Sequence, residues 1–210
     1  MKITLLLAAA VTASFFASTI LDVDAERFGF SGENFLRHPE VLVTSIFLHG
    51  NLEHLLSNIL VLVFAGIAVE GELGRGKMLA IFFLGAFAGD LLSLIFYPFN
   101  SVSIGASGGI FALLGAGMLV RPLDISIYPL AVPVPLAFLG ILYAFYNAYG
   151  FLTDSTSNIS YMAHFGGLAL GLVWGLAEKG LRKGAKIILI SAAIMLLLPA
   201  LFFVLKRGFV

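Results

Sequence analysis

Residues 101–122 read SVSIGASGGIFALLGAGMLVRP, and this stretch decides how the rest of the chain is interpreted. Between its Gly/Ser-rich start and the break at Arg121-Pro122, about 14 mostly apolar residues favour a helix over Ser107–Val120. At a rise of ~1.5 Å per residue this helix is ~21 Å long, shorter than the ~30 Å hydrocarbon core of a bilayer. We therefore expect Ser107 to lie below the membrane surface, where irregular backbone is tolerated only against protein or a water-filled cavity.

The sequence on either side of this stretch is also apolar. Of the 210 residues, 60% are hydrophobic and only 11% are charged, which lies outside the range of soluble globular proteins. A transmembrane helix needs about 20 mostly apolar residues, and runs of this kind predict an all-α integral membrane protein. The seven candidate spans are Ile3–Leu21, Leu52–Val69, Met78–Tyr97, Ser107–Val120, Pro129–Gly150, Ile159–Ala177 and Ala185–Leu205.

Composition also limits the chemistry of the protein. Lysine plus arginine and aspartate plus glutamate both total 12, so the sequence offers no basic surface for nucleic acid, and we expect no nucleic-acid partner. The chain has no cysteine, which excludes a disulfide framework, a thiolate zinc site and a cysteine nucleophile. Chemistry must come from Ser, His, Asp, Glu or an exogenous ion.

The first span has two readings. Met1-Lys2 followed by an apolar run resembles a signal peptide, but no small-x-small cleavage site follows at Leu21-Asp22. Placing the N-terminus in the cytoplasm puts eight Lys/Arg residues inside and four outside, which favours a multi-pass protein of the cell membrane in that orientation. The long connection Asp22–Gly50 then lies outside, and its acidic and Phe residues predict a loop partly embedded at the interface rather than a flexible linker.

Polar side chains inside spans are costly, so each is a functional candidate; they are His54, Asn58, Asp90, Ser107, Asn147 and His164, with His49 and Glu53 at the outer edge of the second span. Gly105 and Gly108 flank Ser107 and permit a tight turn into a helix and close approach of another backbone. The free amides at that helix start suit an oxyanion. The alternative reading is a patch of small residues for helix packing.

The helix of His164 continues with a stripe of small residues spaced four apart, Gly167, Gly171 and Gly175, on one helix face. This stripe predicts close packing against the face of the fourth span that carries Ser107, Phe111, Gly115 and Met118. If these faces meet, the imidazole of His164 can take the proton of the Ser107 hydroxyl and make it nucleophilic. The alternative reading is a neutral histidine bonded to a backbone carbonyl.

The second span supplies further polar groups near its outer end. His54 and Asn58 are four residues apart, hence on one helix face, and both can donate hydrogen bonds toward a single point, as an oxyanion requires. A metal site built from His49, His54 and His164 is the alternative. It lacks the His-Glu-x-x-His helix of zinc proteases and an obvious fourth ligand, so we expect no metal and no cofactor.

Three motifs in this order resemble the rhomboid intramembrane proteases. They are His49, His54 and Asn58 in the second span, Gly-Ala-Ser-Gly at the start of a short fourth span, and Ala-His-Phe-Gly-Gly with Gly171 in the sixth. The resemblance covers about Leu21 to Lys179. It implies a rhomboid-like six-helix core in residues 1–180 and one additional C-terminal transmembrane helix in residues 181–210.

The resemblance also implies roles for individual residues. Ser107 and His164 would form a catalytic dyad without an essential aspartate, and His54, Asn58 and the Ser107 amide would form the oxyanion hole. His49 and Gly105 would organise the site, and Phe111 takes the place of a tyrosine that stacks on the catalytic histidine in many members. One feature departs from the family pattern: Glu40-Val41 replaces the Trp-Arg pair of many members. Asp90 has two interpretations, a packing residue or a modulator of the pocket. Glu70 is expected to be structural.

The sequence thus predicts an intramembrane serine endopeptidase that acts on transmembrane protein substrates within the lipid bilayer. The first alternative is a proteolytically silent rhomboid-like binding or chaperone factor, although both the serine and the histidine are present. A transporter would show a repeat between its halves, and none is visible. An aspartyl intramembrane protease needs two aspartates on facing spans, and Asp90 is the only one well inside.

Overall fold

The computed structural model describes residues 2–126, 134–154 and 159–208, with side chains described up to residue 197. The elements, in chain order, are α1 (Lys2–Ile20), α2 (Ala25–Phe28), α3 (Gly32–Arg37), α4 (Val41–Phe47), α5 (Leu52–Leu73), α6 (Arg75–Phe96), α7 (Ser107–Val120), β1 (Ile125–Ser126), β2 (Val134–Pro135), α8 (Leu136–Thr153), α9 (Tyr161–Lys179) and α10 (Leu181–Gly208).

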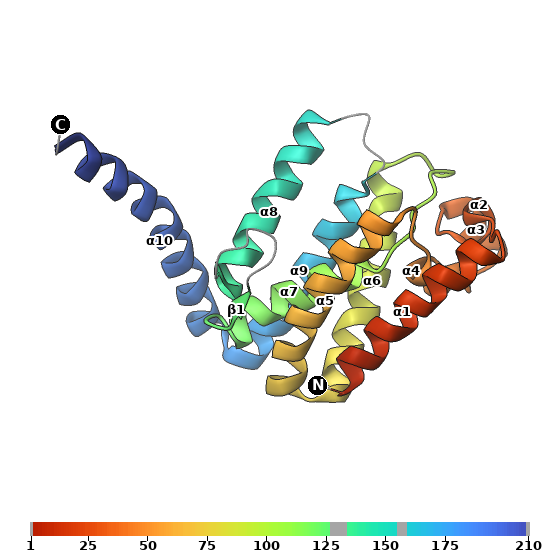
Figure 1. Ribbon diagram of the computed structural model, residues 1–210, viewed down its shortest axis with the longest axis horizontal. Helices are drawn as coiled ribbons and strands as arrows, with labels where there is room; N and C mark the ends of the chain where they lie inside the picture. Colours follow the sequence, from red (N-terminus) through yellow and green to blue (C-terminus); the bar gives the residue numbers. More distant parts are fainter. Residues whose placement is uncertain (1, 127–133, 155–158, 209–210) are drawn as a thin grey trace.

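The short helix α7 forms the centre of the bundle. Every residue from Gly108 to Val120 is buried, and the helix packs against α5, α6, α8 and α9 (Figure 1). Its bounds coincide with those predicted from the Gly/Ser-rich start and the Arg121-Pro122 break. A 14-residue helix enclosed on all sides can begin inside the membrane, because neighbouring helices rather than lipid surround its irregular start.

The helical membrane fold is confirmed. Within the described residues, four helices are long and apolar enough to cross a membrane by length and composition, namely α1, α5, α6 and α8, and α7 is shorter. The sixth and seventh predicted spans correspond to α9 and α10, which are helical but fall outside that set of four. For α10 the side chains are described only to residue 197.

The fifth span begins later than predicted. We expected a helix from Pro129, a residue outside the described part of the chain, whereas α8 starts at Leu136. Pro135 precedes it with φ −58° and ψ 143°, which is not a helical conformation. A helix that started earlier would have to pass through Pro135, which has no amide hydrogen to donate to the preceding turn. Two residues on each side of the connection instead form the antiparallel pair β1–β2, with Ile125 opposite Pro135.

The segment between α1 and α5 is folded into three short helices and is tied to the chain just before α7. Phe30 is 1% exposed and exchanges backbone hydrogen bonds of 2.9 and 2.7 Å with Ser103. The Gly105 amide donates to the Ser45 carbonyl at 2.9 Å. The first loop thereby supports the turn that leads into Ser107, and Val41, one of the two residues that replace the Trp-Arg pair, is buried in it.

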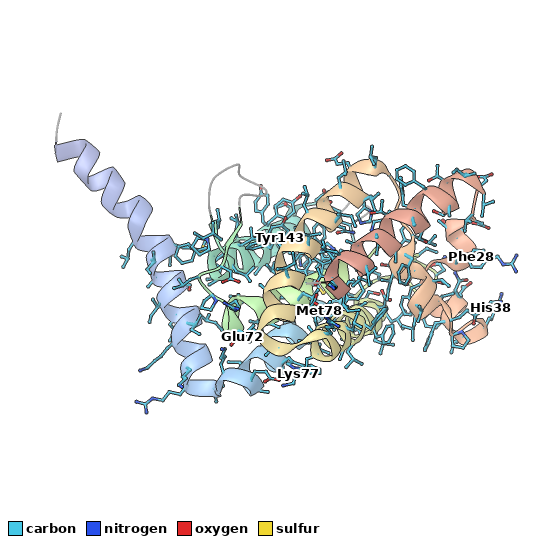
Figure 2. All side chains as sticks on the ribbon, turned by 60° about the horizontal axis from the view of Figure 1, so that its bottom comes forward. Phe28, His38, Glu72, Lys77, Met78 and Tyr143 are labelled. Carbon is cyan, nitrogen blue, oxygen red and sulfur yellow. The ribbon has the colours of Figure 1, made fainter. Side chains whose placement is uncertain are left out.

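The opposite end of the bundle is held by charged side chains. The Glu70 carboxylate on α5 accepts hydrogen bonds from the Thr4 amide at 2.9 Å and the Thr4 hydroxyl at 2.7 Å, which joins α1 to α5. Lys77 pairs with Glu178, and Glu72 pairs with Lys179. Figure 2 shows Glu72 and Lys77 near the turn between α5 and α6, away from Phe28 and His38 in the first-loop region.

The last helix leaves the bundle. α10 starts directly after Gly180, whose φ of +81° favours glycine, and packs against α8 and α9 near its beginning. Its remainder extends away from the other helices (Figure 1). The division into a core of residues 1–180 and an additional helix of residues 181–210 stays a prediction.

Candidate active site

Ser107 and His164 lie within hydrogen-bond distance of each other. Ser107 is the first residue of α7 and His164 lies in the first turn of α9, and the serine Oγ is 2.8 Å from the histidine Nε2. Both side chains are half-buried. The two helix starts thus lie side by side at the same end of the bundle.

Small residues bring the two helices together. A Cβ on Gly167 would collide with the Gly108 carbonyl oxygen, and one on Gly171 would collide with the Ala112 carbonyl oxygen. The backbones of α7 and α9 are therefore in direct contact, as the predicted stripe required. Met118, which we placed on the same face, lies against Gly140 of α8 instead.

Phe111 orients the imidazole ring from one side. Its ring stacks on His164 with centroids 4.3 Å apart and an angle of 8° between the planes. Tyr143 of α8 packs edge-on against Phe111 at 5.7 Å. Phe111 occupies the turn of α7 that follows Ser107, so one helix contributes both the hydroxyl and the stacking ring.

His54 and Asn58 on α5 both reach the turn before Ser107. Gly105 has φ +119°, a conformation that favours glycine, and a Cβ there would lie 2.8 Å from His54 Cε1 and 3.6 Å from Asn58 Nδ2. Glycine is therefore needed at 105 both for its backbone angle and for space. The two side chains lie beside the segment that carries the free amide of Ser107.

His49 contacts both His54 and Asn58. Its Nε2 is 2.9 Å from Asn58 Nδ2, and its ring centroid is 4.9 Å from that of His54. Burial, together with the nearby His54, lowers the pKa of His49 to about 4. A neutral His49 accepts the Asn58 amide hydrogen through Nε2 and leaves the second amide hydrogen of Asn58 for another acceptor.

Asn147 contacts the other side of His164, and the sequence did not predict this contact. Its Oδ1 is 2.9 Å from His164 Nδ1, and the residue is 1% exposed. The available signal was its position, since an amide in the middle of an apolar span needs a partner. The sequence singled out Asn147 on that ground without identifying the partner.

One further polar candidate lies on α6. Asp90 is buried on α6, and its backbone carbonyl accepts a hydrogen bond from the Ser93 hydroxyl at 2.6 Å. Across the described residues, no group of three or more His, Cys, Asp or Glu side chains is arranged to hold a metal ion. A groove of about 290 Å³ follows α5 toward the α7–α8 connection; it is lined by Ile59, Leu60, Val63, Phe64, Ile67, Ala68 and Asp124.

Comparison with known proteins identifies relatives. A family model described as the Rhomboid domain matches residues 37–179. The chain is 34% identical over 134 residues to RHOMBOID-like protein 4 of Arabidopsis thaliana, an alignment that covers 64% of this chain and 32% of that protein. It is 34% identical over 142 residues to Rhomboid protease GluP of Bacillus subtilis, covering 68% of this chain and 26% of that protein.

The similarity is confined to a part of each relative. Rhomboid-related protein 1 of Caenorhabditis elegans matches over 133 residues at 32% identity, which is 37% of its length. The matched segment thus spans 26% to 37% of the length of these three curated relatives. Because the family model covers the segment from the end of α3 to the end of α9, which contains every residue of the cluster described above, the chain belongs to the rhomboid family.

Proposed function

We propose that this protein is an intramembrane serine endopeptidase that cleaves transmembrane segments of other membrane proteins. The observation that carries the proposal is the 2.8 Å contact between Ser107 Oγ and His164 Nε2 at two adjoining helix starts. A serine hydroxyl becomes a useful nucleophile when a neutral imidazole lies within hydrogen-bond distance. Membership of the rhomboid family supports the same assignment.

In the first half of the reaction, Ser107 Oγ attacks the carbonyl carbon of the scissile peptide bond while its proton passes to His164 Nε2. The tetrahedral intermediate then collapses, the carbon–nitrogen bond breaks, and His164 gives the proton to the leaving amine. The N-terminal part of the substrate stays on Ser107 as an ester, and the C-terminal fragment departs with the released amine as its new N-terminus.

In the second half, a water molecule attacks the ester carbonyl and His164 takes the water proton. The carbon–oxygen bond to Ser107 breaks, and the serine recovers its proton from His164 as the carboxylic acid product leaves. Water must reach the site for this step, and the half-buried state of both side chains is consistent with access from the end of the bundle where α7 starts.

In both halves the substrate carbonyl oxygen carries negative charge in the transition state. We propose that His54, Asn58 and the Ser107 amide donate hydrogen bonds to it. The position of both side chains against Gly105, two residues before Ser107, supports this role. Preorganised donors of this kind stabilise a transition state without reorganising when the charge develops.

The substrate is proposed to be a helix in the bilayer that unwinds locally, because an intact helix hides its carbonyl groups in internal hydrogen bonds. Gly or other helix-weakening residues near the cut favour this unwinding. We propose entry between α5 and α8, and the groove along α5 supports that side. A second proposed route is lifting of the Gly150–Ser160 loop, of which residues 155–158 lie outside the described residues. The N-terminus is proposed to be cytoplasmic in a cell membrane.

The test is cleavage of a single-span reporter with a Gly/Ala-rich outer half by the purified full chain in detergent. Ser107→Ala and His164→Ala should each abolish cleavage. Matched controls are Ser101→Ala and His38→Ala, which change an exposed serine and an exposed histidine outside the cluster and should cleave at the wild-type rate. If the wild-type protein and the Ser107 and His164 variants behave alike at equal folding, a silent binding or chaperone role becomes the better account.

A further inference from the structure

Asn147 makes two hydrogen bonds that bridge α8 and α9 next to His164. Its Nδ2 donates to the Tyr161 backbone carbonyl at 2.9 Å, and its Oδ1 lies 2.9 Å from His164 Nδ1. The side chain is 1% exposed, so neither bond competes with bulk water. On the far side of the same imidazole, Nε2 faces the Ser107 hydroxyl at 2.8 Å.

These bonds determine which nitrogen of His164 carries the proton. A backbone carbonyl only accepts hydrogen bonds, so the NH2 group of Asn147 must face Tyr161 and its carbonyl oxygen must face His164. An oxygen acceptor requires an N–H at His164 Nδ1. A neutral imidazole has one N–H, so Nε2 carries the lone pair and faces Ser107.

We infer that Asn147 is a positioning residue that holds His164 in the tautomer able to accept the serine proton. The inference rests on the proposed function and extends it from a pair to a chain of three side chains, Ser107, His164 and Asn147. Without this acceptor, the imidazole can carry its proton on Nε2 and donate it to the serine oxygen. In that form it is no base, and the hydroxyl is not activated.

The same contact also acts after proton transfer. When His164 has taken the serine proton, its Nδ1–H becomes a charged donor, and hydrogen bonds from charged donors are stronger than neutral ones. Asn147 then stabilises the imidazolium in the intermediate. One turn earlier on α8, Tyr143 packs against the Phe111 ring that stacks on His164, so α8 constrains the imidazole through two contacts.

Two substitutions distinguish a role of Asn147 in positioning His164 from a role in holding α8 and α9 together. Asn147→Asp keeps an oxygen acceptor for His164 and loses the donor to Tyr161, whereas Asn147→Leu has a similar volume and loses both bonds. We expect Asn147→Leu to lower kcat at least about tenfold with KM changed less than about twofold, as loss of a group that orients a catalytic histidine does. Asn147→Asp should retain clearly more of the wild-type kcat.

A readout independent of cleavage is the 15N spectrum of the full chain labelled at histidine in detergent, with the His164 signals assigned by their loss in His164→Ala. Wild type and Asn147→Asp should show His164 protonated at Nδ1, and Asn147→Leu should show the Nε2–H form or a mixture. An unchanged His164 tautomer in Asn147→Leu, or an Asn147→Asp variant as slow as Asn147→Leu, would overturn the inference. If the wild type does not cleave at all, the proposed function fails, and the spectra still decide what Asn147 does.

Discussion

The contact between α7 and α9 can be tested by adding a single methyl group at Gly115. A Cβ at this position would lie 2.6 Å from the Leu168 carbonyl oxygen and 3.0 Å from the Leu172 amide nitrogen. Ordinary contacts begin at 3.4 Å, so the Leu168 carbonyl is too close by about 0.8 Å. Both atoms are backbone, and no side-chain rotation can relieve the overlap. Gly115→Ala must therefore push the two helices apart.

The separation reaches the candidate active site because its two halves lie on these helices. A rigid displacement of about 0.8 Å would lengthen the 2.8 Å contact between Ser107 and His164 to about 3.6 Å, which is no longer a hydrogen bond. Misplacement on that scale costs on the order of 10²-fold in rate. Overpacking should also lower the free energy of unfolding by about 1–3 kcal/mol.

The assay is kcat on the single-span reporter together with thermal unfolding in the same detergent. Gly76→Ala is the matched control, because a Cβ there meets no atom within 4 Å and alanine favours a helix by up to about 1 kcal/mol. Gly175→Ala should lie between the two, since its closest contact is a side-chain atom, Leu119 Cδ1 at 2.9 Å, and its closest backbone contact is 3.2 Å away, at the Ala116 carbonyl oxygen. Wild-type kcat and stability in Gly115→Ala would refute the packing argument.

Three further predictions concern other parts of the molecule. His54→Ala or Asn58→Ala should lower kcat by about 10²–10³ with little change in KM, measured on the same reporter, if each donates to the oxyanion. The pKa of His49 falls from 6.5 to about 4 on folding, so the unfolded chain binds more protons between these values; stability should be full above pH 6.5 and decline by up to about 3 kcal/mol toward pH 4. Thermal unfolding at pH 7 and pH 4.5 should show a smaller decline in His49→Gln. Glu70→Gln should cost about 1–3 kcal/mol in the free energy of unfolding, because the Thr4 donors lose a charged acceptor, and equal melting temperatures would contradict this.

The parts of the fold that could be predicted are those marked by strong local signals. The bounds of α7 follow from glycine, serine and proline, which act within a few residues, and apolar spans are recognised by composition alone. The strand pair at Ile125–Ser126 and Val134–Pro135 has two residues per strand, too few for any periodicity. Helices α2, α3 and α4 have four to seven residues, too few for an apolar period to mark them in the sequence.

Some residues of the candidate site could also be predicted from local sequence signals, and others could not. Ser107 and His164 stand out because polar groups in apolar helices are costly, and the glycines around them indicate that their helices approach closely. The partner of Asn147 could not be predicted, because it depends on how α8 is rotated about its axis and where it starts. The start and the rotation of α8 depend on Pro135 and on packing against α7 and α9. A helix that starts at Pro129, as predicted, does not indicate which face of α8 points toward His164.

The membrane gives a physical reason for an amide beside His164. A carboxylate in this position would stabilise the imidazolium form of His164. An ionised group buried among apolar helices, however, costs several kcal/mol of folding free energy unless it is fully paired. Asn147 supplies the same acceptor geometry without a charge, and its NH2 group uses the Tyr161 carbonyl as a second anchor. Ser107, His164 and Asn147 are then all neutral at rest, and in the proposed reaction charge appears only while the peptide bond is being cut. On this reasoning, an acid at position 147 would gain basicity at His164 only by losing stability of the folded chain.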